Sequence, residues 1–185
     1  MARTTVSLDD EKQEQAKAAG LNISQLTREA IDQRLRLPDH HMVNTNQSNL
    51  PGDATGTAIY AEGVVATYGP KDPFGEHLEN IERRDWVHSY QNGAGVRAAG
   101  IVLEDGTSDP VAPEDMIFHS ASSNANEYHV PVRWQVVVEE RSAVTSDEID
   151  HICGRPLYAS TYNEVQDDDN PELLLDVLFG RDQRS

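Results

Sequence analysis

The first residues of the chain combine side chains that can hydrogen-bond to nucleobases with alternating apolar neighbours. Residues 3–8 are Arg-Thr-Thr-Val-Ser-Leu, and the period of two predicts one short strand over residues 4–8. One face of this strand would pack into a core and carries Thr4, Val6 and Leu8. The opposite face would stay accessible and carries Arg3, Thr5 and Ser7. Arginine can donate two hydrogen bonds to guanine O6 and N7, and hydroxyl groups can bond to several base edges, so this face could recognise bases.

Two amphipathic helices are expected to follow this strand. The first would end near Ala19, because Gly20 is the residue type that commonly terminates a helix. Asn22 or Ser24 can cap the second helix, and Pro38 would stop it. Its apolar residues recur at helical spacing, namely Ile23, Leu26, Ala30, Ile31 and Leu35.

A five-residue strand with two short helices needs a partner to fold. One strand cannot satisfy its own edges, and so few residues cannot bury a sufficient core. Two copies could pair their strands as an antiparallel ribbon over four helices. A two-stranded ribbon fits the major groove of B-DNA, where the base edges can be distinguished. We therefore expect residues 1–37 to form a homodimer that binds double-stranded DNA.

The same segment resembles the ribbon-helix-helix family, which includes Arc- and MetJ-like repressors and many antitoxins. The residues over 5–8 and 16–26 are especially similar to CcdA-type antitoxins. The resemblance implies that the outward strand face contacts bases. It also implies that a DNA phosphate binds the backbone amides at the start of the second helix, those of Asn22, Ile23 and Ser24. Free N–H groups converge at a helix start and favour an anion there.

The charge of the chain is distributed unevenly. The formal net charge is −17, but residues 1–37 contain six basic and six acidic side chains. Residues 38–185 therefore carry the whole excess, with nine basic and 26 acidic side chains. Only three lysines occur beside twelve arginines, and this acidic, lysine-poor composition resembles that of proteins from salt-loving archaea. An acidic surface keeps such proteins hydrated, and salt screens its self-repulsion.

The rest of the chain is expected to be a linker and an α+β domain. Residues 38–57 are polar, rich in turn formers and without periodicity, which is typical of a linker. Residues 58–185 show β-type patterns, with strands expected at 59–67, 85–90, 96–103, 130–140 and 157–162. Helices are expected at 73–82, 146–152 and 171–179. The predicted architecture is a dimeric ribbon-helix-helix module followed by a small β-barrel-like domain.

Segments 81–90, 96–102 and 128–138 resemble the EVE-type branch of the PUA-like barrels. A helix, an Asp-aromatic-Val strand, a Gly-ended return strand and a later Arg-Trp strand follow one another in the expected order. Arg84 departs from the pattern, which has glycine before the aspartate. The resemblance implies nucleic-acid binding, including modified bases held by stacking. The candidate pocket residues are Tyr68, Trp86, Tyr90, Arg97, Arg133 and Trp134, although large aromatic side chains in a small β domain also commonly form the core.

Other chemistry-bearing residues do not form a recognised catalytic or metal-binding motif. No Gly-x-Ser-x-Gly, phosphate-binding Gly-x-x-x-x-Gly-Lys or His-Glu-x-x-His sequence occurs, so we expect neither an enzyme nor a cofactor. Cys153 is expected to be a buried thiol, and the run 167–169 a solvated helix cap. His40 and His41 are expected to be solvated, and no metal-ligand spacing links the other histidines, among them His88, His119 and His129.

These patterns predict a sequence-specific transcriptional regulator that acts as a dimer through residues 1–37. The second domain would sense a ligand or add a nucleic-acid contact. One alternative is an antitoxin that represses its own operon and binds a toxin protein. Another is a reader of modified DNA in a defence system. No apolar run approaches the roughly 20 residues of a membrane span, and no signal-peptide core is present, so we expect a cytoplasmic protein.

Overall fold

The chain divides by its contacts into two units, Met1–Leu37 and Pro38–Ser185, which are described separately. The computed structural model describes residues 12, 15, 16, 18–20, 22, 37–45, 58–117 and 126–183. In the first unit, Lys12, Gln15, Ala16 and Ala18 are helical. Gly20 follows with a φ of +69°, so the expected glycine terminus of the first helix is confirmed. The predicted strand 4–8 and second helix lie outside the described residues.

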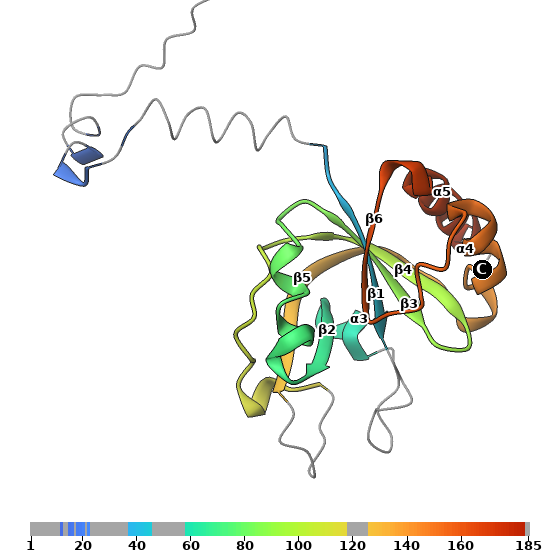
Figure 1. Ribbon diagram of the computed structural model, residues 1–185, viewed down its shortest axis with the longest axis horizontal. Helices are drawn as coiled ribbons and strands as arrows, with labels where there is room; N and C mark the ends of the chain where they lie inside the picture. The colour runs from blue at the N-terminus through green and yellow to red at the C-terminus, as the bar shows by residue number, and fades with distance from the viewer. Residues whose placement is uncertain are drawn as a thin grey trace, which may run out of the picture. The chain divides into compact units, whose positions relative to one another are not determined.

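The second unit is built on a mixed sheet of six strands among the described residues (Figure 1). In chain order these are β1 (His40–Thr45), β2 (Val64–Gly69), β3 (Trp86–Gln91), β4 (Gly95–Val102), β5 (Asn126–Val137) and β6 (Tyr162–Val165). Their order across the sheet is β2-β5-β4-β3-β1-β6. Only the β1–β3 pair is parallel, and the other pairs are antiparallel.

Three α-helices accompany the sheet in the described part of this unit. They are α3 (Ala58–Glu62), α4 (Ser146–Cys153) and α5 (Pro171–Asp182). Short helical turns occur at Lys71–Gly75, Leu78–Asn80, Pro113–Asp115, Glu140–Ser142 and Asp167–Asp169. The Thr145 side chain and Glu148 form a reciprocal capping box at the start of α4, and Gly154 ends that helix in the left-handed conformation. Among the described residues, no helix is long and apolar enough to cross a membrane.

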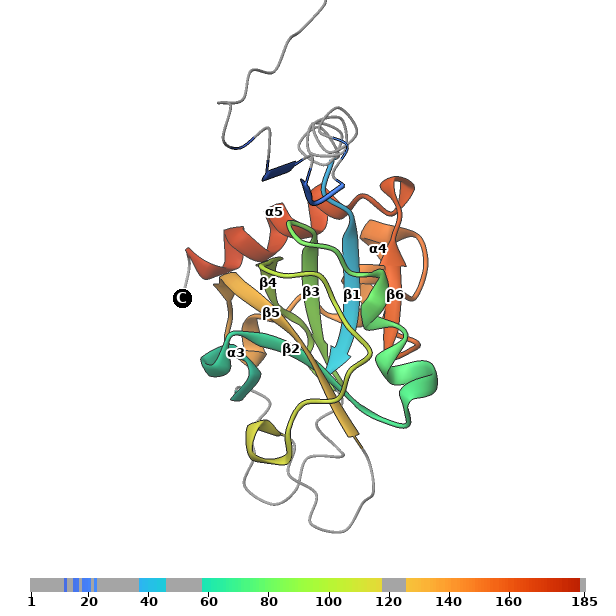
Figure 2. The ribbon, with the colours of Figure 1, turned by 90° about the vertical axis from the view of Figure 1, so that its left-hand side faces the viewer.

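Both faces of the sheet are covered, and each has its own apolar core. Helices α4 and α5 pack together on one face, as Figures 1 and 2 show. The core under these helices contains Met42, Tyr90, Ala99, Val136, Ile149, Leu174 and Leu178. The core on the opposite face contains Val43, Val87, Val102, Val132, Leu78 and Ile81. A third, smaller cluster beneath α3 is formed by Ile59 and Ala66.

The expected α+β class is confirmed, and so are β3, β4, β5, α4 and α5, with ends shifted by a few residues. The linker prediction is wrong over residues 40–45, which form the inner strand β1 between β3 and β6. Residues 59–67 were predicted as one strand but form α3 and then β2. The helix expected at 73–82 is two short turns, and the last strand lies at 162–165 instead of 157–162.

The sequence patterns did not predict strand β1, because its two histidines are polar but buried. Both His40 and His41 were expected to be solvated, but they are 7% and 2% exposed. The period-two rule assumes that one face of a strand meets water, whereas β1 lies between two other strands with a covered surface on each side. Its polar side chains form hydrogen bonds with residues distant in sequence, as His41 does with Asp85 and Tyr162.

Arg84 offers a test of the turn that leads into β3. It has a φ of +82°, in the left-handed region that disfavours any side chain, and it stands where the EVE-type pattern has glycine. We expect Arg84→Gly to raise the free energy of unfolding by about 1 kcal/mol, measured by urea titration. Arg83→Gly is the matched control, because Arg83 is not among the positive-φ residues and should lose about 0.5–1 kcal/mol. Equal losses at both positions would contradict this account.

Candidate functional site

The predicted DNA-binding residues belong to the first unit. Asn22 is described, is exposed and lies outside regular structure. The remaining five, Arg3, Thr5, Ser7, Ile23 and Ser24, lie outside the described residues. Their roles stay predictions from the sequence.

Two of the predicted pocket aromatics pack under α4 and α5. The Trp86 ring lies edge-on to Phe179 of α5, with the ring centroids 6.4 Å apart, and stacks on His40 at 6.3 Å. Tyr90 is buried and stacks on Tyr158 with the centroids 5.1 Å apart. Both residues therefore contribute to the helix-covered core.

Two other predicted pocket residues meet at Tyr60 of α3. The rings of Trp134 and Tyr60 lie edge to face with centroids 5.2 Å apart, and Trp134 Nε1 donates a hydrogen bond to the Ile59 carbonyl at 3.3 Å. The guanidinium of Arg97 lies 5.8 Å from the centre of the Tyr60 ring. Arg97 is only 8% exposed and donates to the Val138 carbonyl and to Gln91 Oε1. These contacts hold α3 against β4 and β5.

The last two predicted pocket residues lie elsewhere. Tyr68 is half-buried and packs against the Ile59 and Ala66 cluster, whereas Arg133 is exposed on β5. The structure thus gathers Trp134 and Arg97 around Tyr60. It places Trp86 and Tyr90 separately, in the core under α4 and α5. None of the six lines the cavity beside α3.

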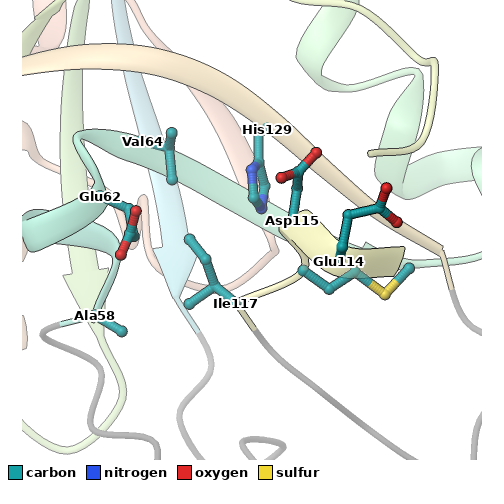
Figure 3. A pocket seen from close by; sticks show the side chains of 8 residues that line it. Ala58, Glu62, Val64, Glu114, Asp115, Ile117 and His129 are labelled. Carbon is teal, nitrogen blue, oxygen red and sulfur yellow. The ribbon is translucent and has the colours of Figure 1, made fainter. Parts of the chain in front are cut away.

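A cavity of about 480 Å³ lies between α3, β2, β5 and the turn at Pro113–Asp115 (Figure 3). Its lining residues are Ala58, Glu62, Val64, Glu114, Asp115, Met116, Ile117 and His129. Figure 3 shows Glu62, Asp115 and His129 contributing polar side chains from three separate segments. Ligand-binding cavities commonly have volumes of about 300–1,000 Å³, so this one is large enough for a small molecule. We call it the α3 cavity.

A buried carboxylate supports one wall of the α3 cavity. Glu127 and His129 are two residues apart on β5, so their side chains share a face of the strand. Glu127 is 1% exposed, and its Oε1 accepts a hydrogen bond from the Ile117 backbone N–H at 2.9 Å and pairs with His129 Nε2. The backbone carbonyl of Glu127 also accepts from Val111 N–H at 2.8 Å. One side chain therefore positions both the imidazole and the loop that carries Ile117.

The α3 cavity is acidic. Glu62, Glu114 and Asp115 line it and are exposed to solvent, and the Glu127 carboxylate lies behind His129. The only basic group in the lining is an imidazole that is already paired with Glu127. Such a surface attracts cations and repels phosphate groups.

A second cluster of ionisable groups joins β1 to β3. His41 contacts Asp85 Oδ2 through Nε2 at 3.0 Å and the Tyr162 hydroxyl through Nδ1 at 2.9 Å. His40 Nδ1 lies 3.1 Å from Nε2 of His88. Burial and the nearby His40 and His41 lower the pKa of His88 to about 3, so this ring is neutral at neutral pH. These bonds fasten β1 into the sheet.

Sequence patterns missed both of these groups. The only available signal was an acid and a histidine at i and i+2 within a strand pattern, and this is weak in a chain with 32 acidic residues. Cys153 is buried, as expected, and burial raises its pKa to about 11. The run 167–169 is not wholly solvated, because Asp169 is 3% exposed and forms an ion pair with Arg155 at 2.5 Å.

Comparison with protein families concerns the first unit and the beginning of the second. Residues 2–47 match the family model described as post-segregation antitoxin CcdA. This segment is thus similar to CcdA-type antitoxins, in agreement with the resemblance seen in the sequence. The match covers the predicted base-contacting strand and the predicted phosphate-binding residues, and it ends just beyond β1. No curated protein matches the chain significantly.

Solved structures resemble the second unit in fold. The YTH domain-containing protein mmi1, solved in complex with RNA, has a TM-score of 0.50 and 10% sequence identity, over 80% of this chain and 85% of that one. A protein of Rhodopseudomonas palustris has a TM-score of 0.42 and 12% identity, over 76% and 93% of the two chains. A hypothetical protein of Leishmania major has a TM-score of 0.41 and 10% identity, over 78% and 98%. The mmi1 match shows a likeness of fold and agrees with the expected α+β class.

Proposed function

We propose that the chain is a dimeric, sequence-specific DNA-binding regulator with a C-terminal sensing domain. The observation that carries the proposal is the match of residues 2–47 to the CcdA antitoxin family. The alternating sequence pattern at residues 4–8 supports it, because a strand predicted there and paired with a second copy would give a ribbon with one apolar and one polar face. Arg3, Thr5 and Ser7 would contact bases, and the amides of residues 22–24 would bind a phosphate.

The C-terminal domain is proposed to regulate the DNA-binding module and to contribute little to its affinity for the DNA backbone. Its fold resembles that of an RNA-bound YTH domain, which supports a recognition role. However, residues 38–185 contain nine basic and 26 acidic side chains, and backbone binding depends on basic groups that displace counterions. A direct contact with nucleic acid would therefore be local. A small ligand without phosphate groups could bind without being repelled by the negative charge of this domain.

An antitoxin role is the second candidate, and the family description favours it. An antitoxin would use the same DNA module and would also bind a toxin protein. Residues 40–45 form a strand of a folded domain and residues 40–43 are buried, so a toxin would not bind this strand as a free tail. Co-purification with the product of a neighbouring toxin-like gene would support the antitoxin role.

The DNA-binding proposal is tested by footprinting the upstream region of the gene at high potassium chloride. Arg3→Ala and Thr5→Ala should each weaken specific binding by about 1–3 kcal/mol per lost base contact, with little change in melting temperature. Arg141→Ala is the control, because Arg141 is exposed and pairs only with Glu139 among the ion pairs of the described structure. Protection by the wild type that is unchanged in both strand variants would overturn the assigned strand face.

A further inference from the structure

The α3 cavity combines an acidic rim with apolar walls. Its carboxylates are those of Glu62 on α3 and of Glu114 and Asp115 in the turn at Pro113–Asp115. Between them lie the apolar side chains of Ala58, Val64, Met116 and Ile117. Ionised carboxylates accept hydrogen bonds and donate none, so a matching ligand must supply N–H or O–H donors and a positive charge.

His129 does not change this requirement. Its Nε2 is paired with Glu127, whose carboxylate is buried at 1% exposure. A positive charge on the imidazole would be compensated by Glu127, and three other carboxylates still face the cavity. The lining therefore favours a cationic occupant in either protonation state of His129.

The spacing of the acidic groups favours an extended cation over a metal ion. Among the residues that the structure describes, no three His, Cys, Asp or Glu side chains approach closely enough to hold one metal ion. An organic cation can instead donate a hydrogen bond to one carboxylate at a time, and here the carboxylates lie on different segments. The apolar residues between these carboxylates would contact methylene groups.

We propose that the α3 cavity binds a small organic cation that has N–H donors separated by a short aliphatic segment, such as a diamine. The ammonium groups would bind the carboxylates of Glu62 and Asp115. The methylene segment would lie against Val64 and Ile117. This inference deepens the sensing role proposed above and rests on it, because it names the chemical class of ligand that the second domain senses.

Calorimetric titration of the full-length protein with 1,4-diaminobutane tests the inference. We expect saturable binding with one site per chain, and no heat from 1,4-butanediol, which has the same length without charge. The double variant Glu62→Gln, Asp115→Asn should weaken binding at least tenfold. Both side chains are exposed, so the variant should keep the melting temperature of the wild type.

Glu140→Gln is the matched control for the general acidity of the protein. Glu140 is exposed on another turn and does not line the cavity, so this variant should change the affinity less than twofold. An equal loss in the control and cavity variants would show diffuse attraction to an acidic surface and would overturn the proposal. Absence of saturable binding by the wild type would overturn it as well.

Footprinting the same preparations separates this inference from the proposed DNA-binding function. Operator protection without diamine binding would refute the cavity assignment alone. Diamine binding without operator protection would refute the regulatory function and leave the site in place. A shift of the operator-binding curve on addition of the diamine, lost in the double cavity variant, would support both.

Discussion

Replacing Gly95 with alanine should lower the free energy of unfolding by about 3–5 kcal/mol. Gly95 begins β4 with a φ of +125°, a conformation that side chains rarely adopt. An added Cβ would lie 2.0 Å from the Val144 carbonyl oxygen and 2.7 Å from its carbon. Because these are backbone atoms, the clash cannot be relieved by rotating a side chain.

The contact at Gly95 matters for the position of α4. Val96 and Val144 exchange two backbone hydrogen bonds of 2.8 and 2.9 Å, which attach the segment before α4 to the edge of β4. An alanine at position 95 would push this segment outward and open the core that contains Ile149. The expected loss therefore combines backbone strain with lost packing.

Gly93→Ala is the control within the same turn. Gly93 also has positive φ, at +82°, but its added Cβ would meet nothing within 4 Å. Only the conformational cost of about 1 kcal/mol should remain. Chemical denaturation of both variants at one salt concentration measures the difference, and similar losses would show that the Val144 contact is unimportant.

Asp85→Ala should destabilise the domain by a similar amount, about 3–5 kcal/mol. Asp85 is fully buried, and it accepts hydrogen bonds from the backbone N–H groups of Asp39 and Glu82 and pairs with His41. Burial alone would raise the pKa of Asp85, but the bond from His41 and the two backbone N–H groups more than offset it, and the pKa is lowered. The variant would leave the buried His41 side chain and two part-buried backbone N–H groups without this acceptor.

Asp109→Ala is the exposed control and should change stability by less than about 0.5 kcal/mol. Asp85→Asn separates charge from hydrogen bonding, because the amide oxygen can still accept while the negative charge opposite His41 is lost. Its loss should fall between those of the other two variants, measured by the same denaturation method. If Asp85→Ala and Asp109→Ala are equally mild, the carboxylate does not fasten β1 to the turn before β3.

The sequence by itself determined the elements whose pattern is local. Strands β3, β4 and β5 contain apolar and aromatic residues between turn-forming segments, α4 carries the residues of its caps, and α5 begins at a proline. The resemblance of the first segment to CcdA-type antitoxins depended on the order of a strand, a glycine turn and a cap, all within a short stretch of residues. The family match at residues 2–47 agrees with it.

Only the tertiary structure decided the elements whose stability comes from distant partners. Strand β1 is largely polar in sequence and is held inside the sheet because His41 bonds to Asp85 and Tyr162, which follow 44 and 121 residues later. The α3 cavity likewise depends on Glu127 accepting a bond from the Ile117 N–H and pairing with His129. The aromatic side chains that suggested a base pocket are distributed among three apolar clusters, because they come from three different strands and only the fold shows what covers each face of the sheet.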